Sequence, residues 1–312
     1  MVKIGLVNID VSHPLAFSEI LLKENRARYT AIYNDGFRGD DEVDAFVEKL
    51  GLNKCANIDE LAEQTDIGFI QGCNWDLHLD HAMPFISRGK PVFIDKPIVG
   101  NIQDCMRLEK LVSEGAVVLG SSSMRYAQEI IDFVNLPTAE RGDIINIFGT
   151  CGIDEFNYGI HVVESIGGFI DAPAESTIFT GRATVNGNIC ETYTVNFASG
   201  ATATFHTMSG GWLPCNFLVT TTNGVYNINV DVSMVYKALL DRIWDYMETG
   251  ENALADVSAL CESIKILLAG RISRENGGGT VKLSDIPTDD PGFDGHAFAV
   301  GYAANAKKIY LD

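Results

Sequence analysis

The chain has 312 residues, which suits two domains or one large one, and its 46% hydrophobic and 21% charged residues are typical of an ordinary globular protein. The formal net charge of −19 argues against partners that need a basic surface, namely nucleic acids and anionic membranes. No apolar run approaches the roughly 20 residues of a membrane span. The segment Met1-Val2-Lys3-Ile4-Gly5 leads straight into a strand pattern, so no signal peptide is expected.

Cysteine usage also limits the possible functions. The seven cysteines are scattered and include no C-x-x-C pair, so neither a disulfide framework nor a zinc site is predicted. Asp10-x-x-His13 offers two metal ligands without a third, and no metal is assigned. A reducing, cytoplasmic compartment is the expected location.

The first 120 residues alternate short apolar strands with amphipathic helices. Strands are expected over residues 3–8, 29–33, 67–71, 92–94 and 116–120. Helices are expected over residues 14–23, 41–50, 58–63, 77–88 and 102–114. Alternation at this spacing is typical of βαβ units around a parallel sheet.

The pattern changes after about residue 122. Helices around 127–134 and His161 flank a strand at 143–150, and strand-like runs fill 176–232. These runs are separated by the turn dipeptides Asn186-Gly187, Ser199-Gly200 and Asn223-Gly224. They predict an antiparallel meander covered by helices on one face. Helices over 235–249 and 253–274 follow, Gly277-Gly278-Gly279 ends the second, and no element is predicted from Pro287 on.

The predicted fold class is therefore α/β, with two domains. Residues 1–121 form a doubly wound parallel sheet, and residues 122–312 form an α+β domain with a mainly antiparallel sheet.

The strand at 92–94 ends abruptly in Asp95, Lys96 and Pro97. Charged side chains avoid burial unless they are paired, so folding alone does not require them there. In open α/β sheets, ligands bind at the carboxyl ends of the strands. Lys96 is therefore a candidate for chemistry, with a surface salt bridge beside a turn proline as the alternative.

Together these features resemble the Gfo/Idh/MocA family of oxidoreductases over nearly the whole chain. The stretch from Asn74-Trp75-Asp76-Leu77-His78 to Asp95-Lys96-Pro97 is similar to the family's segment ending in Glu-Lys-Pro, with Asp95 in place of Glu. Asn157-Tyr158-Gly159-Ile160-His161 is similar to its Asp-x-Gly-x-His, with Asn157 in place of Asp. Arg125 follows the strand at 116–120, where the family often has Arg.

This resemblance implies a Rossmann domain that holds NAD or NADP and a sheet domain that shapes a sugar or polyol site. The implied function is an NAD(P)-dependent dehydrogenase acting on a CH–OH group, with Lys96 as general acid/base together with His161 and Asn157. Hydride leaves a carbinol carbon only as its hydroxyl loses a proton, so a base must lie within hydrogen-bond reach. The alternative for His161 is a core or capping histidine. The family also implies a homo-oligomer, either a dimer or a tetramer.

One departure from the usual pattern concerns the loop after the first strand. The dinucleotide fingerprint G-x-G-x-x-G is replaced here at all three glycines, by Asn8, Asp10 and His13. Asn tolerates the left-handed conformation. A carboxylate about 4 Å from a phosphate would cost on the order of 4 kcal/mol at an effective dielectric near 20, unless Asp10 points away or caps the helix with Ser12. A protonated His13 could contact phosphate.

The acidic position after the second strand is retained as Asn34-Asp35. A carboxylate there would bind the ribose hydroxyls and favour NAD, although Arg38 leaves room for NADP. Alternatively, these residues and Gly36 simply form a turn. His78 is as well explained by a helix face as by a ligand.

The residues expected to bind the cofactor share the carboxyl edge of the parallel sheet: Asn8, Asp10, Ser12, His13, Asn34, Asp35, Cys73, Asn74, His78, Asp95, Lys96 and Arg125. Those expected at the substrate are Lys96, Tyr126, Tyr158 and His161. Two other functions stay open: a non-catalytic sensor or binding protein that has lost cofactor binding, and a lyase or epimerase with tightly held NAD.

Overall fold

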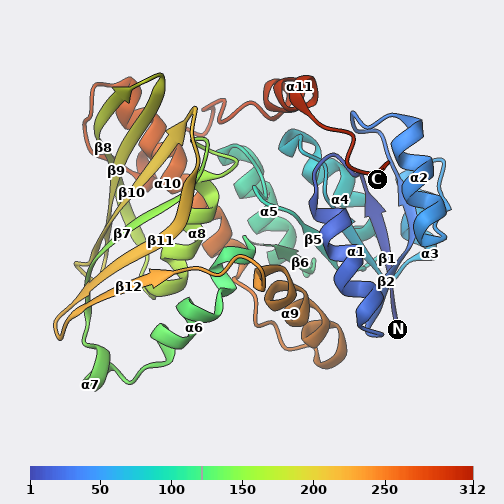
Figure 1. Ribbon diagram of the computed structural model, residues 1–312, viewed down its shortest axis with the longest axis horizontal. Coiled ribbons are helices and arrows are strands. Elements are labelled where there is room, and N and C mark those ends of the chain that lie inside the picture. The colour runs from blue at the N-terminus through green and yellow to red at the C-terminus, as the bar shows by residue number, and fades with distance from the viewer. Residues whose placement is uncertain (121, 312) are drawn as a thin grey trace.

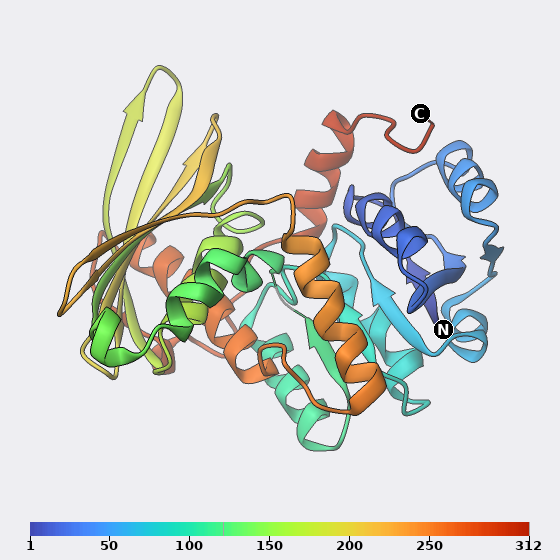
Figure 2. The ribbon, with the colours of Figure 1, turned by 60° about the horizontal axis from the view of Figure 1, so that its bottom comes forward.

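Two β-sheets lie at opposite ends of the computed structural model, which describes residues 1–120 and 122–311 (Figure 1). Helices fill the space between the sheets, and the C-terminal segment returns to the N-terminal sheet (Figure 2). This arrangement confirms the expected α/β fold class with a second, mainly antiparallel sheet.

The N-terminal sheet is entirely parallel and has the strand order β3-β2-β1-β4-β5-β6. Its strands are β1 (Val2–Val7), β2 (Ala27–Tyr33), β3 (Asn53–Lys54), β4 (Ile67–Ile70), β5 (Val92–Ile94) and β6 (Val118–Gly120). The central strands are buried on both faces because helices cover both. The strand order reverses beside β1, and ligands of such sheets bind in the crevice at that point.

The helices of this half follow the predicted amphipathic segments. They are α1 (His13–Lys23), α2 (Asp40–Leu50), α3 (Ile58–Gln64), α4 (His78–Ile86) and α5 (Ile102–Ser113), with a 3₁₀ turn η1 (Trp75–Leu77) before α4. Side-chain caps set two of the starts, since Asn57 accepts from Glu60 N and Asn101 from Asp104 N. The two-residue strand β3 was not predicted, because both its side chains are exposed and polar.

The second sheet has the order β12-β11-β7-β10-β9-β8-β13. Its strands are β7 (Ile144–Gly152), β8 (Ala174–Val185), β9 (Asn188–Phe197), β10 (Thr202–Ser209), β11 (Leu213–Thr221), β12 (Val225–Asn229) and β13 (Val281–Lys282). The prediction of one continuous meander is wrong, because β7 lies between β10 and β11 and pairs with β10 in parallel. The hairpin turns are confirmed where Asn186 and Gly187 have φ of 53° and 82°.

The remaining helices are α6 (Gln128–Asn135), α7 (Thr138–Arg141), α8 (Gly159–Phe169), α9 (Val235–Thr249), α10 (Val257–Glu275) and α11 (Gly295–Asn305), with 3₁₀ turns η2 (Ser123–Tyr126) and η3 (Leu283–Asp285). Helices α8 and α10 cover one face of the second sheet (Figure 1). A buried apolar cluster continues from Ile94 of β5 to Val162 of α8 and Leu267 of α10. In the described parts of the chain, no helix is long and apolar enough to cross a membrane.

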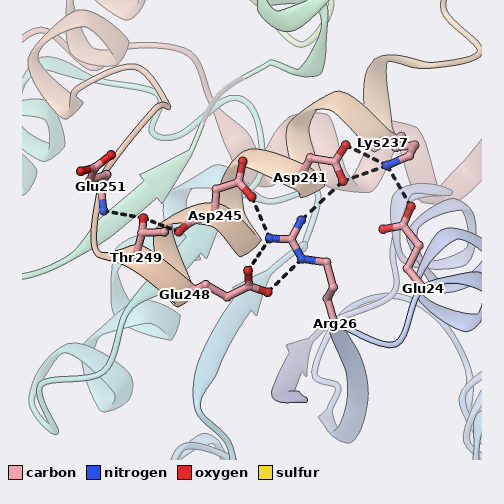
Figure 3. Close-up of polar contacts among 8 residues, drawn as sticks. All are labelled: Glu24, Arg26, Lys237, Asp241, Asp245, Glu248, Thr249 and Glu251. Atoms are coloured by element: carbon pink, nitrogen blue, oxygen red, sulfur yellow. Dashed lines mark hydrogen bonds and ion pairs between the residues drawn. The ribbon is translucent and has the colours of Figure 1, made fainter.

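Helix α9 packs on the N-terminal sheet although it comes late in the chain. Its Trp244 ring stacks on Phe69 of β4 with ring centroids 5.9 Å apart. At its exposed side, Arg26 donates to Asp245 and Glu248 at 2.7 and 2.9 Å (Figure 3). A core contact and an ion-pair cluster thus hold α9 against the start of β2.

Candidate functional site

Lys96 lies where the N-terminal sheet meets the start of α8. Its Nζ donates to the carbonyl oxygen and to Oδ1 of Asn157, both at 3.0 Å. The same nitrogen lies 5.1 Å from the ring centroid of Tyr158. Burial lowers the pKa of Lys96 below its usual 10.5, although Asp95 and Asp154 act in the opposite direction. The site therefore holds an ammonium that loses its proton more readily than a surface lysine.

His161 occupies the first turn of α8 and is 5% exposed. A hydrogen bond of 2.5 Å joins its Nδ1 to the hydroxyl of Ser122, and its ring lies 5.5 Å from that of Tyr158. Burial, followed by the charges of Lys96 and His13, holds the pKa of His161 well below 6.5. His161 is therefore neutral at neutral pH, and the charge of Lys96 acts on its ring.

Asp95, just before Lys96, pairs with His13. The distance from His13 Nδ1 to Asp95 Oδ2 is 2.6 Å, and the His13 ring stacks on Phe17 with centroids 5.9 Å apart. Burial alone would raise the pKa of Asp95, but the charge and hydrogen bond of His13, with Lys96, lower it to about 2. His13 is thus directed toward the Lys96 end of the site.

In the loop after β1, the side chains that stand in place of the glycines are hydrogen-bonded to neighbouring loops. Asn8 has a φ of 65°, and its Oδ1 accepts from the backbone nitrogens of Asp35 and Gly36 at 2.9 and 3.1 Å. Asp10 is 2% exposed, and its two oxygens accept from Phe37 N at 3.1 Å and Cys73 N at 3.0 Å. Burial raises the pKa of Asp10, and these two hydrogen bonds oppose that shift.

The carboxylate of Asp10 thereby links the loops after β1, β2 and β4. A Cβ on Gly36 would lie 2.1 Å from Asp10 Oδ1, so a glycine in the second loop gives the carboxylate its space. Asn34 supports the same junction, because its Oδ1 accepts from Ile9 N at 3.3 Å. Ser12 precedes α1 and makes no side-chain cap.

Asp35 lines a cavity of about 430 Å³ together with Asn8, Asn74 and His81. His81 Nε2 lies 3.2 Å from Asp35 Oδ2, and this hydrogen bond lowers the pKa of Asp35. Helix α11 forms the outer wall of the cavity. The carboxylate at the end of β2 is therefore available to a ligand in the cavity.

Three expected site residues have other partners. His78 is 1% exposed, and its two ring nitrogens lie 2.9 and 3.2 Å from the carbonyl oxygens of Gly72 and Ile98, as a histidine that ties loops together would. Arg125 donates to the carbonyls of Glu164 and Gly167 at 3.1 and 2.8 Å. The Tyr126 hydroxyl accepts from Ala255 N at 2.8 Å.

Sequence reasoning missed two residues that shape the cluster. Asp154 Oδ1 accepts from the backbone nitrogens of Phe156 and Tyr158, at 3.0 and 2.8 Å, and so forms the turn that presents Asn157. An Asp two residues before an aromatic residue is a weak turn signal that could have indicated it. No sequence pattern links Ser122 to His161, because 39 residues separate them.

Comparisons with known proteins agree with the fold. Residues 10–122 match the Gfo/Idh/MocA family model, described as an oxidoreductase family with an NAD-binding Rossmann fold. No curated protein matches. Among solved structures, a probable dehydrogenase from Thermotoga maritima is 15% identical with a TM-score of 0.76, covering 91% of this chain and 100% of that one.

Two further solved structures have named substrates. Scyllo-inositol dehydrogenase from Lactobacillus casei, with bound NAD(H) and scyllo-inositol, is 14% identical with a TM-score of 0.75, covering 91% of this chain and 99% of that one. UDP-N-acetylglucosamine 3-dehydrogenase from Acidithiobacillus ferrooxidans is 13% identical with a TM-score of 0.70, covering 87% and 97%. At these identities the likeness establishes the fold, and over residues 10–122 the chain is similar to the Gfo/Idh/MocA oxidoreductases.

Proposed function

We propose that the protein is an NAD-dependent dehydrogenase that transfers hydride between nicotinamide and a CH–OH group of a polyol or sugar. The observation that carries this proposal is the cluster of Lys96 with Asn157, Tyr158 and His161, formed where β5 meets α8. The polyol or sugar class is supported by the names of the two neighbours bound to, or acting on, such compounds.

In this proposal Lys96 is the general base. A bound nicotinamide dinucleotide would supply the hydride acceptor. Lys96 Nζ takes the hydroxyl proton, and the lowered pKa of its ammonium makes the neutral amine accessible. Neutral His161 holds the substrate hydroxyl or relays its proton, with its ring fixed by the hydrogen bond to Ser122.

The residues along the sheet edge fit the adenosine half of NAD. The Asp35 carboxylate borders a cavity of about 430 Å³ and suits a ribose diol. At the diphosphate loop, the charge of Asp10 is offset by two backbone N–H donors, which reduces the repulsion expected for a carboxylate there. Arg38 does not favour NADP, because its side chain is 3% exposed and is bonded to Glu42 and to the Asp10 carbonyl.

Isothermal titration with NADH and NADPH tests the proposal. We expect NADH to bind and NADPH to bind at least about tenfold more weakly, because its 2′-phosphate would meet the Asp35 carboxylate. Asp35→Asn should reduce the difference in affinity between NADH and NADPH. Asp132→Asn on α6 is the matched control and should leave that difference unchanged.

A second candidate is a non-catalytic binding protein of the same fold, and the buried Asp10 in place of a glycine is the observation that favours it. The absence of heat with either dinucleotide at millimolar concentration would exclude the dehydrogenase and leave this candidate.

The pH dependence of catalysis tests the role of Lys96. Alcohol oxidation requires the neutral amine, so kcat/KM should rise with pH and level off above the pKa of Lys96, which lies below 10.5. Ketone reduction requires the ammonium and should show the opposite trend. Asn157→Asp places a carboxylate beside the ammonium and should raise the midpoint by roughly one pH unit or more. An unchanged midpoint in kcat/KM profiles with scyllo-inositol would remove Lys96 from the titration.

The division of labour between the two halves is also a proposal. Residues 1–121 would bind the dinucleotide, and residues 122–312 would shape the substrate site and a homo-oligomer interface; residues 121 and 312 themselves lie outside the described residues. The dimeric or tetrameric state and the cytoplasmic location stay predictions.

A further inference from the structure

The C-terminal segment crosses the carboxyl edge of the parallel sheet (Figures 1 and 2). Residues 293–311, called the strap below, comprise α11 and the chain on either side of it. The strap contacts the loops that follow β4, β2 and β1. These loops border the cavity that contains Asp35.

The first end of the strap is held by the loop after β4. Trp75 Nε1 donates to the Phe293 carbonyl at 2.7 Å, and Asp76 accepts from His296 N at 3.0 Å. The ring of Phe298 lies 4.8 Å from that of Trp75. Both hydrogen bonds use side chains of the N-terminal half, so this anchor joins the two ends of the sequence.

The second end is held by the loops after β1 and β2. The Tyr310 hydroxyl donates to the Val11 carbonyl at 2.5 Å, and Tyr310 is 3% exposed. Arg38 donates to the Lys307 carbonyl at 2.5 Å. A buried aromatic residue and a buried guanidinium thus secure this end.

The middle of the strap is less buried than its ends, although the ring of Tyr302 lies 5.9 Å from that of Phe37. Within α11 only Gly295 is buried. The cavity face of the helix carries His296, Ala299, Val300 and Ala303, and the two small alanine side chains leave space above Asp35. Weak packing between two fixed ends is typical of a segment that opens locally.

We propose that the strap is the outer wall of the adenosine half of the dinucleotide site and that it must open for the dinucleotide to enter or leave. This inference rests on the proposed NAD dependence. The strap covers the cavity but leaves its volume free, so a ligand can bind beneath the strap and be retained by it. It thereby provides retention in a protein whose diphosphate loop lacks the three usual glycines.

A larger side chain on the cavity face of α11 tests whether the strap forms the outer wall of the dinucleotide site. Ala303→Trp directs an indole into the space between the strap and Asp35, and we expect NADH affinity to fall by at least about tenfold in titrations. Ala304→Trp, on the same helix at an exposed position, is the matched control and should bind NADH like the unmodified protein. Equal affinities for the two variants would overturn the proposal.

The rate of NADH release tests whether the strap must open for the dinucleotide to leave. Tyr310→Phe keeps the buried ring and removes the hydrogen bond to Val11, so NADH release in stopped-flow displacement should become about fivefold faster. Lys308→Ala breaks only the exposed pair with Asp41 and should leave the rate unchanged. Unchanged release in Tyr310→Phe overturns the strap alone. Failure of every protein to bind NADH instead overturns the proposed function, and the strap proposal with it.

Discussion

Lys96→Ala should lower turnover by at least roughly 10²-fold while leaving NADH affinity largely intact. The substitution removes the only cation that donates to both the carbonyl and the side chain of Asn157 among the described contacts. Because a general base acts on the reacting proton and not on the bound dinucleotide, the loss should be in kcat. Steady-state rates with scyllo-inositol and NADH titrations on the same preparation measure both quantities.

Two companion variants keep this result interpretable. Lys96→Met retains most of the side-chain volume, so a similar loss in that variant assigns the effect to the amine and not to a cavity. Lys110→Ala removes an exposed lysine on α5 and should be neutral. Turnover in Lys96→Ala equal to that of the unmodified protein would contradict the proposed mechanism.

The sequence predicted the parts of the site that depend on local pattern. The strand at 92–94 and the charged residues after it indicate a ligand-facing strand end without further information, and β5 ends at Ile94 as expected. His161 could be linked to Lys96 only through the family resemblance, because 65 residues of chain separate them and no periodicity connects them.

The role of Asp10 could not be predicted from its own segment. Its partners, Phe37 N and Cys73 N, lie 27 and 63 residues away, and the loop sequence contains no information about them. The absence of the three glycines is visible in the sequence, but its physical consequence depends on loops from two other strands. The same limit applies to β7, whose parallel pairing with β10 is not encoded in the turn residues.

The strap shows a third limit. Helix α11 is rich in alanine and has no apolar stripe, because it has no continuous core contact along its length. Its anchors are formed by residues 218, 269 and 299 positions away in the chain. Amphipathic periodicity therefore gave no signal for a helix whose hydrogen-bonded anchors lie on either side of it.

The buried Arg38, just before α2, should contribute more to stability than any exposed ion pair of that helix. Its side chain is 3% exposed and bonds Glu42, which is 5% exposed, at 2.9 Å. It also donates to the carbonyls of Asp10 and Lys307. Arg38→Ala leaves a buried carboxylate without a counter-charge and should lower the free energy of unfolding by about 3–5 kcal/mol in urea titrations.

Lys54→Ala is the matched control for Arg38→Ala. Lys54 pairs with Asp40 and Asp44 on α2, but its side chain is 45% exposed. Its loss should therefore lower the free energy of unfolding by less than about 1 kcal/mol. The double variant Arg38→Ala, Glu42→Ala distinguishes the unpaired charge of Glu42 from the lost hydrogen bonds as the cause of the destabilisation. If the uncompensated charge of Glu42 dominates, removing it as well should recover part of the lost stability. If the loss of the hydrogen bonds to the Asp10 and Lys307 carbonyls dominates instead, the double variant should be no more stable than Arg38→Ala. Equal losses of unfolding free energy in Arg38→Ala and Lys54→Ala would show that the buried position adds nothing.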